Sequence, residues 1–138
     1  PPMSKFYRTR EAPLTAVDTR TALTFLGSAT AESPSNIVVP KGATKLLEAR
    51  VAVGHDFAAT GSNSFFFRLE GDGLEDSPVY GPMGAFGSSV ATGIRRINPS
   101  YKIPLDVPVV AGNSIAVSAE MAGADGGTVA AGVTLVFA

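Results

Sequence analysis

Four segments of this chain alternate apolar and polar residues, and this feature limits the folds open to the chain more than any other. The segments span residues 44–53, 64–70, 114–121 and 128–137. Because successive side chains of a β-strand point to opposite faces, such segments form strands with one buried face. No segment carries the apolar stripe of an amphipathic helix, which repeats every ~3.6 residues. We therefore predict an antiparallel, all-β fold. Its expected inward-facing residues are Leu47, Val51, Phe65, Phe67, Ile115, Val117, Val133 and Leu135.

Less regular stretches complete the predicted set of roughly eight strands. They cover residues 19–26, 37–39, 88–97 and 101–110. In the last of these, Pro104 and Pro108 share one face, and because proline has no amide hydrogen we expect a strand at a sheet edge. Residues 71–87 contain five glycines and two prolines and are predicted to be a loop. Residues 123–127 are predicted to be a hairpin-type loop.

The number and spacing of these strands favour a β-sandwich. A chain of 138 residues suits one domain, which we place at residues 18–138. Long early connections and a short final one favour a single jelly roll. An immunoglobulin-like sandwich is the alternative, although the sequence lacks the cysteines and tryptophan that mark that fold.

Residues 1–17 are predicted to form an extended N-terminal arm. Pro1, Pro2 and Pro13 oppose a helix, and basic and aromatic residues lie between them. We expect the arm to be an assembly interface that contributes little to the stability of its own domain. In the alternative, it adds a strand to its own sheet. The expected contact residues are Phe6, Tyr7, Arg8 and Arg10, through apolar burial and charge-assisted hydrogen bonds to a neighbour.

The charges of the chain nearly cancel, since 11 basic residues accompany 12 acidic ones. A dominant electrostatic attachment to nucleic acid is therefore not expected, which leaves at most a minor contact through Arg95, Arg96, Lys102 and the basic arm. We expect no membrane partner, because the apolar runs are far shorter than the ~20 residues that a spanning helix needs. The absence of cysteine excludes disulfides, zinc–thiolate sites and thiol nucleophiles.

No set of residues predicts catalysis. His55 is the only histidine, and no cysteine or second histidine completes a metal site with it and Asp56. Residues 70–76 hold four carboxylates, but their spacing departs from the EF-hand pattern, so we interpret them as a solvated turn and leave calcium binding open. No Gly-x-Ser-x-Gly elbow is present. We predict that the protein is not an enzyme and that it carries no cofactor, and we assign no residues to a metal site.

The glycine-rich stretch at 81–87 holds two apolar side chains, Met83 and Phe86. If they are exposed, they form a contact loop for a partner. If they are buried, they hold the loop against its own domain. The sequence leaves both interpretations open.

Three segments and the arm together resemble the single jelly-roll proteins of icosahedral virus shells. The segments are NIVVPKGATKLLEARVAV at 36–53, VPVVAGNSIAVSAEM at 107–121 and TVAAGVTLVFA at 128–138. The resemblance implies a capsid or capsid-decorating subunit whose arm and loops join neighbours. Its implied partners are copies of itself and other shell proteins, and its implied location is the virion, assembled in the host cytoplasm.

The alternative function is that of a secreted β-sandwich binding module, for example one for carbohydrate. Such modules present aromatic platforms, yet this chain has no tryptophan and three tyrosines. Tyr80 and Tyr101 are the candidates for exposed tyrosines. An enzyme built on a β-sandwich is a third hypothesis, and the sequence supports it least.

Overall fold

The computed structural model describes residues 5–14, 20–23, 36–56, 61–71, 73–90, 93–97, 100–122 and 128–138. Within these ranges, the side chains of residues 13, 53–56, 61–63, 83–90, 93–97, 122 and 128–130 are not described. The described chain forms strands and no helix. They are β1 (Phe6–Leu14), β2 (Thr21–Ala22), β3 (Ile37–Val38), β4 (Lys45–Asp56), β5 (Gly61–Gly71), β6 (Val79–Val90), β7 (Gly93–Ile97), β8 (Ser100–Pro108), β9 (Ser114–Ala122) and β10 (Thr128–Phe137).

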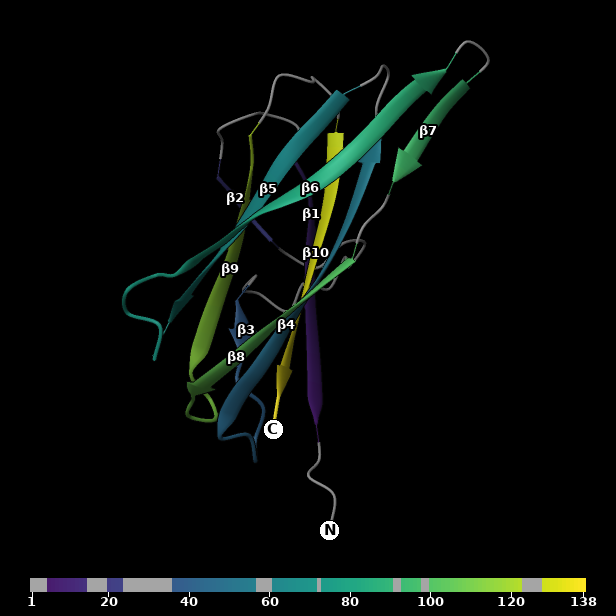
Figure 1. Cartoon of the computed structure of the whole chain (residues 1–138). Helices are drawn as coiled ribbons and strands as arrows, with labels where there is room; N and C mark the ends of the chain where they lie inside the picture. Colours follow the sequence, from purple (N-terminus) through teal and green to yellow (C-terminus); the bar gives the residue numbers. More distant parts are fainter. Residues whose placement is uncertain are drawn as a thin grey trace, which may run out of the picture.

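The strands build two antiparallel sheets that face each other as a sandwich (Figure 1). The four-stranded sheet has the order β1-β10-β4-β8. The six-stranded sheet has the order β2-β9-β5-β6-β7, and β3 also pairs with β9. The predicted antiparallel β-sandwich is thus confirmed. The chain crosses between the sheets at most connections and remains in one sheet from β5 to β7, an order consistent with the predicted jelly roll.

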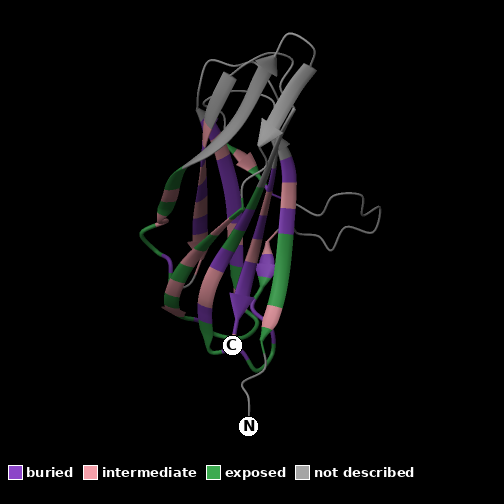
Figure 2. Cartoon of the chain, turned by 45° about the vertical axis from the view of Figure 1, so that its right-hand side comes forward, coloured by how far each residue is buried: buried purple, intermediate pink, exposed green. Residues whose placement is uncertain are grey.

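The core lies between the two sheets, and buried residues alternate with less buried ones along several of the strands (Figure 2). Phe65, Phe67 and Phe137 are its largest fully buried side chains. The ring of Phe67 stacks on that of Tyr80 with their centroids 4.8 Å apart. The core prediction is confirmed at seven of its eight positions: Val51, Phe65, Phe67, Ile115, Val117, Val133 and Leu135.

The exception is Leu47, where the predicted register is wrong by one residue. Leu46 is fully buried, whereas Leu47 is only partly buried. Against β10, the step from Leu46 to Glu48 faces a single step from Phe137 to Val136, so β4 contains one extra residue there. Against β8 the register also shifts at this point, but there the extra residue lies in β8, between Pro104 and Val107. Such a bulge exchanges the faces of all residues on one side of it. Alternation extrapolated from Val51 back to Leu47 therefore selects the wrong leucine.

Strand β8 confirms the prediction of a proline-bearing edge strand. It is the last strand of the four-stranded sheet. Its residues alternate between exposed and half-buried along the whole strand, with Pro104 and Pro108 on the exposed face. Because both prolines lack an amide hydrogen, this edge offers fewer donors to a further strand.

The predicted arm differs most from the structure. Residues 6–14 form β1, which pairs with β10 over its full length, from Phe6 opposite Phe137 to Leu14 opposite Val129. Ala12 and Leu14 are buried in the core. These residues therefore follow the alternative in which the segment adds a strand to its own sheet, and the sandwich begins before residue 18. Residues 1–4 and 15–19 lie outside the described part of the chain.

Two loop predictions also need correction. Residues 79–87 belong to β6, which pairs with β5 on one side and β7 on the other. At Gly81 the backbone φ is 137°, and an added Cβ would lie 2.7 Å from the carbonyl oxygen of Phe65. This glycine thus permits close strand packing at a bulge and does not mark a loop. Residues 123–127 link β9 to β10 in the other sheet, so this connection is not a hairpin.

Candidate interaction surface

The outward-facing side of the four-stranded sheet is the best-defined surface of the molecule. The strand pairing arranges its residues in three rows across β1, β10, β4 and β8. The rows are Tyr7, Val136, Glu48 and Pro104; Thr9, Thr134, Arg50 and Lys102; and Glu11, Gly132, Ala52 and Ser100. We call these residues the outer face.

A charge network occupies the middle of the outer face. Arg50 donates from Nε to Glu48 Oε1 at 3.0 Å, and its Nη2 lies 2.9 Å from the same oxygen. Lys102 Nζ lies 3.4 Å from Glu48 Oε2, and only 12% of the Glu48 side chain is exposed. Partial desolvation raises the pKa of Glu48, but the hydrogen bond from Arg50 and the charges of Lys102 and Arg50 outweigh it and leave that pKa below its ordinary value.

The network extends to the edge strand through an aromatic ring. The guanidinium carbon of Arg50 lies 5.3 Å from the centroid of the Tyr7 ring, within the range of a cation–π interaction. Tyr7 itself is 47% exposed. Between these residues, Val136 of β10 is fully buried although it faces outward. The outer face therefore includes one buried apolar side chain, that of Val136, as well as its charged residues.

A groove of about 340 Å³ crosses the outer face. Gly132 and Ala52 give it a low floor, and Glu11 and Lys102 stand at its two sides. Thr9 and Thr134 share a hydrogen bond of 2.7 Å between their hydroxyl oxygens beside it. The groove combines hydroxyls, a carboxylate and cations in a space suited to a small polar group.

The residues predicted as assembly contacts fall into different environments. Tyr7 and Arg8 are exposed on β1, and Phe6 is half-buried and packs against the core. Arg8 donates from its guanidinium to the carbonyl oxygen of Tyr7 at 2.9 Å. The structure therefore leaves Tyr7 and Arg8 accessible to a partner.

Arg10 differs from the prediction, because it is buried within its own domain. Only 2% of its surface is exposed. Its guanidinium donates to the carbonyl oxygens of Thr9 at 2.9 Å and Asn36 at 3.2 Å. Alternation along β1 directs residue 10 inward with Ala12 and Leu14, so its guanidinium is held by backbone carbonyls of its own domain.

The predicted contact residues Met83 and Phe86 lie in strand β6, so they are not part of a loop. Met83 stands opposite Phe65 of β5, and Phe86 stands between Ser62 of β5 and Ile97 of β7. Their side chains lie outside the described part of the structure, so their role as contacts stays a prediction. His55 and Asp56 end β4, and their side chains are likewise outside it.

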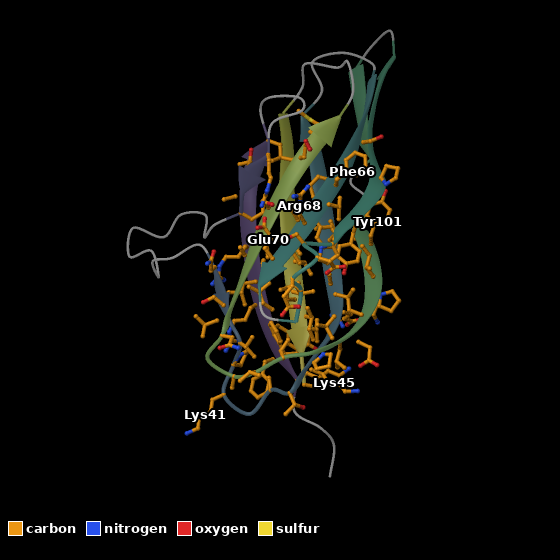
Figure 3. All side chains as sticks on the ribbon, turned by 90° about the vertical axis from the view of Figure 1, so that its left-hand side faces the viewer. Lys41, Lys45, Phe66, Arg68, Glu70 and Tyr101 are labelled. Carbon is orange, nitrogen blue, oxygen red and sulfur yellow. The ribbon has the colours of Figure 1, made fainter. Side chains whose placement is uncertain are left out.

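The acidic segment 70–76 is divided between a strand and a turn. Glu70 belongs to β5 and forms an ion pair with Arg20, whose Nε also donates to Ser118 Oγ at 2.8 Å. In Figure 3, Phe66, Arg68 and Glu70 follow one another along this strand. The Gly73 amide donates to Glu75 Oε1 at 3.0 Å and lowers the pKa of Glu75. Among the described residues, no group of three or more His, Cys, Asp or Glu side chains is placed to hold a metal.

Comparison with known proteins adds no family. No protein-family model matches the chain, and no curated protein matches it. In the described residues, no helix is both long enough and apolar enough to cross a bilayer.

The charge network could be predicted only in part from the sequence. Alternation places Glu48 and Arg50 on the same face of β4, two residues apart. The contribution of Lys102 depends on the pairing of β4 with β8, and the cation–π contact depends on β1 lying two strands away. No local signal in the sequence reports either of these positions.

Proposed function

We propose that this protein is a structural subunit that assembles with copies of itself, as the subunits that build or decorate a virus shell do. One observation carries the proposal: the four-stranded sheet ends in two unlike edge strands. β8 carries two outward prolines, whereas β1 has one proline, Pro13, next to its last residue. The proline-free part of β1, residues 6–12, exposes backbone donors and acceptors that a further strand can use.

The accessible groups on β1 support this assignment. Over nine residues β1 keeps an unbroken register with β10, and no other described strand pairs with it. Tyr7 and Arg8 project from this strand into solvent. Tyrosine and arginine are enriched at protein interfaces, because each combines a large contact area with hydrogen-bonding capacity.

The distribution of charge supports copies of the chain and other shell proteins as partners, with nucleic acid at most a minor one. Several cationic side chains are already paired within the domain: Arg50 and Lys102 with Glu48, Lys45 with Asp106, and Arg20 with Glu70. We place the working location of the subunit in the virion, after assembly in the host cytoplasm. No catalytic role and no membrane partner are part of the proposal.

The test is the mass of the native particle. Light scattering across a wide range of concentrations, followed by electron microscopy, should show a discrete assembly much larger than the 14.1 kDa chain. The variant Tyr7→Ala should shift the population toward monomer, while Lys41→Ala, on an exposed turn at the lower end of Figure 3, should not. A wild-type chain that remains monomeric at every concentration would refute the proposal.

A second candidate is carbohydrate binding in the groove. It is favoured by the hydroxyls of Thr9, Thr134 and Ser100 beside the Glu11 carboxylate. An added Cβ at Gly132 would meet Glu11 Cγ at 3.6 Å, an ordinary contact, so Gly132→Val should fill the groove and keep the fold. Titration calorimetry with a panel of oligosaccharides should then show binding by wild type and none by this variant. If wild type binds no sugar in the panel, this candidate is discarded.

A further inference from the structure

The hydrogen bonds of the neighbouring strand β10 show which backbone groups of β1 point away from the sheet. Ala138 donates to the carbonyl oxygen of Lys45 and accepts from the Lys45 amide, both at 3.0 Å, so both its backbone groups point to β4. Because successive residues of a strand point to alternate sides, Phe137 points to β1 and pairs there with Phe6.

The same alternation runs without a shift along β1. It directs the backbone groups of Phe6, Arg8 and Arg10 to β10, and those of Tyr7, Thr9 and Glu11 to the opposite edge, where no described strand pairs with β1. Pro13 falls in the second set, which fits the rule that a proline on an edge strand turns its nitrogen away from the sheet. This edge, with which no described strand pairs, therefore has amide donors at residues 7, 9 and 11. The carbonyl oxygens of Tyr7 and Thr9 already accept one hydrogen bond each, from the guanidinium groups of Arg8 and Arg10 at 2.9 Å, and each keeps a second lone pair for a facing strand.

The charges along β1 select a partner. Lys5, immediately before β1, and Glu11, within it, carry opposite charges and lie six residues apart along this edge. An antiparallel copy of β1 placed so that the two Arg8 residues meet on a two-fold axis brings Lys5 of each chain opposite Glu11 of the other. Opposite charges in directly facing positions stabilise a strand pair, and by symmetry the contact occurs twice.

Other registers are less favourable. Centring the pair on Thr9 places Arg8 opposite Arg10 of the second copy twice, and like charges in facing positions are destabilising. Centring it on Arg10 places Pro13, which has no amide hydrogen, opposite Tyr7. The register centred on Arg8 has one like-charged contact, on the axis itself, where the exposed guanidinium groups can turn into solvent.

We propose that two copies of this chain join through antiparallel pairing of their β1 strands, centred on Arg8, so that their four-stranded sheets merge into one. This inference rests on the proposed self-assembly and specifies its contact. The merged sheet has a single outer face on which the two grooves are related by the two-fold axis. The contact is isologous, so it closes as a dimer that further contacts can build into a larger shell.

Charge exchange tests the register. Lys5→Glu or Glu11→Lys alone should weaken dimer formation by about tenfold, because each turns two attractive contacts into repulsive ones. The double exchange should restore dimerisation. Lys41→Glu, which makes the same charge change on an exposed turn, should leave the dimer constant unchanged. Sedimentation equilibrium gives the constants, and a double exchange that is no stronger than the single variants would overturn the proposal.

Because the chain has no cysteine, single cysteines give an independent test on a clean background. Residues facing each other on the axis in a non-hydrogen-bonded pair have Cα atoms ~4.5 Å apart, within the reach of a disulfide. Under mild oxidation Arg8→Cys should form a covalent dimer, whereas Thr9→Cys and Val110→Cys should not. If Thr9→Cys links instead, the register is wrong. If the chain assembles but Arg8→Cys forms no disulfide, the proposed β1 contact is wrong while the proposed self-assembly stands. If the chain never associates, both proposals are wrong.

Discussion

Arg50 and Tyr7 belong to strands that are not neighbours, yet the Arg50 guanidinium carbon lies 5.3 Å from the centre of the Tyr7 ring. Strand β10 runs between them, and its Val136 is fully buried although it points away from the core. The contact therefore ties the edge strand β1 to β4 by a side-chain bridge over the outer face.

Replacing Tyr7 with alanine should measure this bridge. We expect Tyr7→Ala to lower the free energy of unfolding by about 1 kcal/mol, because the variant loses an exposed cation–π contact and uncovers Val136. Tyr7→Phe keeps the ring and should lose much less. Urea unfolding of both variants under conditions that keep the chain monomeric gives the comparison. Equal losses would show that the ring over Arg50 contributes nothing.

Glu48 should make stability depend on pH in the acid range. Its pKa is lowered in the folded chain from an ordinary value of 4.5, so the folded state favours the ionised carboxylate. This contribution is fully present above that ordinary value and is lost as the pH falls through the lower folded pKa. We expect Glu48→Gln to flatten the acid limb of a plot of unfolding free energy against pH. An acid limb identical to that of wild type would contradict the network.

The bulge in β4 predicts unequal effects for two adjacent leucines. Leu46→Ala should cost about 2–5 kcal/mol, since it empties space in the core, whereas Leu47→Ala should cost less than about half as much. Leu46 is fully buried and Leu47 only partly. Denaturant unfolding of the two variants provides the measurement. A larger loss at Leu47 would place the extra residue elsewhere in the strand.

Removing residues 1–12 should now destabilise the isolated subunit, contrary to the expectation for a free arm. The deletion removes most of β1, exposes the side of β10 that it covers and takes Arg10 and Ala12 out of the interior. We expect the melting temperature to fall by about 10 °C or more. Removing residues 1–4 leaves β1 intact and serves as the control. An unchanged melting temperature after the longer deletion would show that β1 is dispensable for the fold.

Alternation was sufficient to predict the strands that have one apolar face. It identified the inward residues of β5, β9 and β10, such as Phe65, Ile115 and Val133, because burial on one side imposes a period of two. It failed at β1, because Arg8 and Arg10 occupy the side of the strand that faces inward. Two basic residues at these positions hid the apolar face, and the segment was predicted to be a basic arm. It also failed at β6, where close packing against β5 requires glycine.

The candidate surface was less accessible from the sequence, because it depends on which strands become neighbours. Glu11, Gly132, Ala52 and Ser100 form one row although they are far apart in the chain. Tyr7 and Arg8 were predicted as contact residues from their type, and the structure places both on an accessible edge. Which backbone groups of β1 point to that edge follows only once the alternation of backbone groups along β10 is known.

Hydrogen exchange at the edge of β1 tests the central claim most directly. Amide exchange of the native chain, followed by nuclear magnetic resonance at concentrations below and above the association midpoint, reports each position separately. Self-assembly through β1 predicts that the amides of Tyr7, Thr9 and Glu11 become protected on association, while that of Lys102 on the opposite edge strand keeps its rate. Association that leaves these three β1 amides unprotected, or no association at any concentration, would contradict the account.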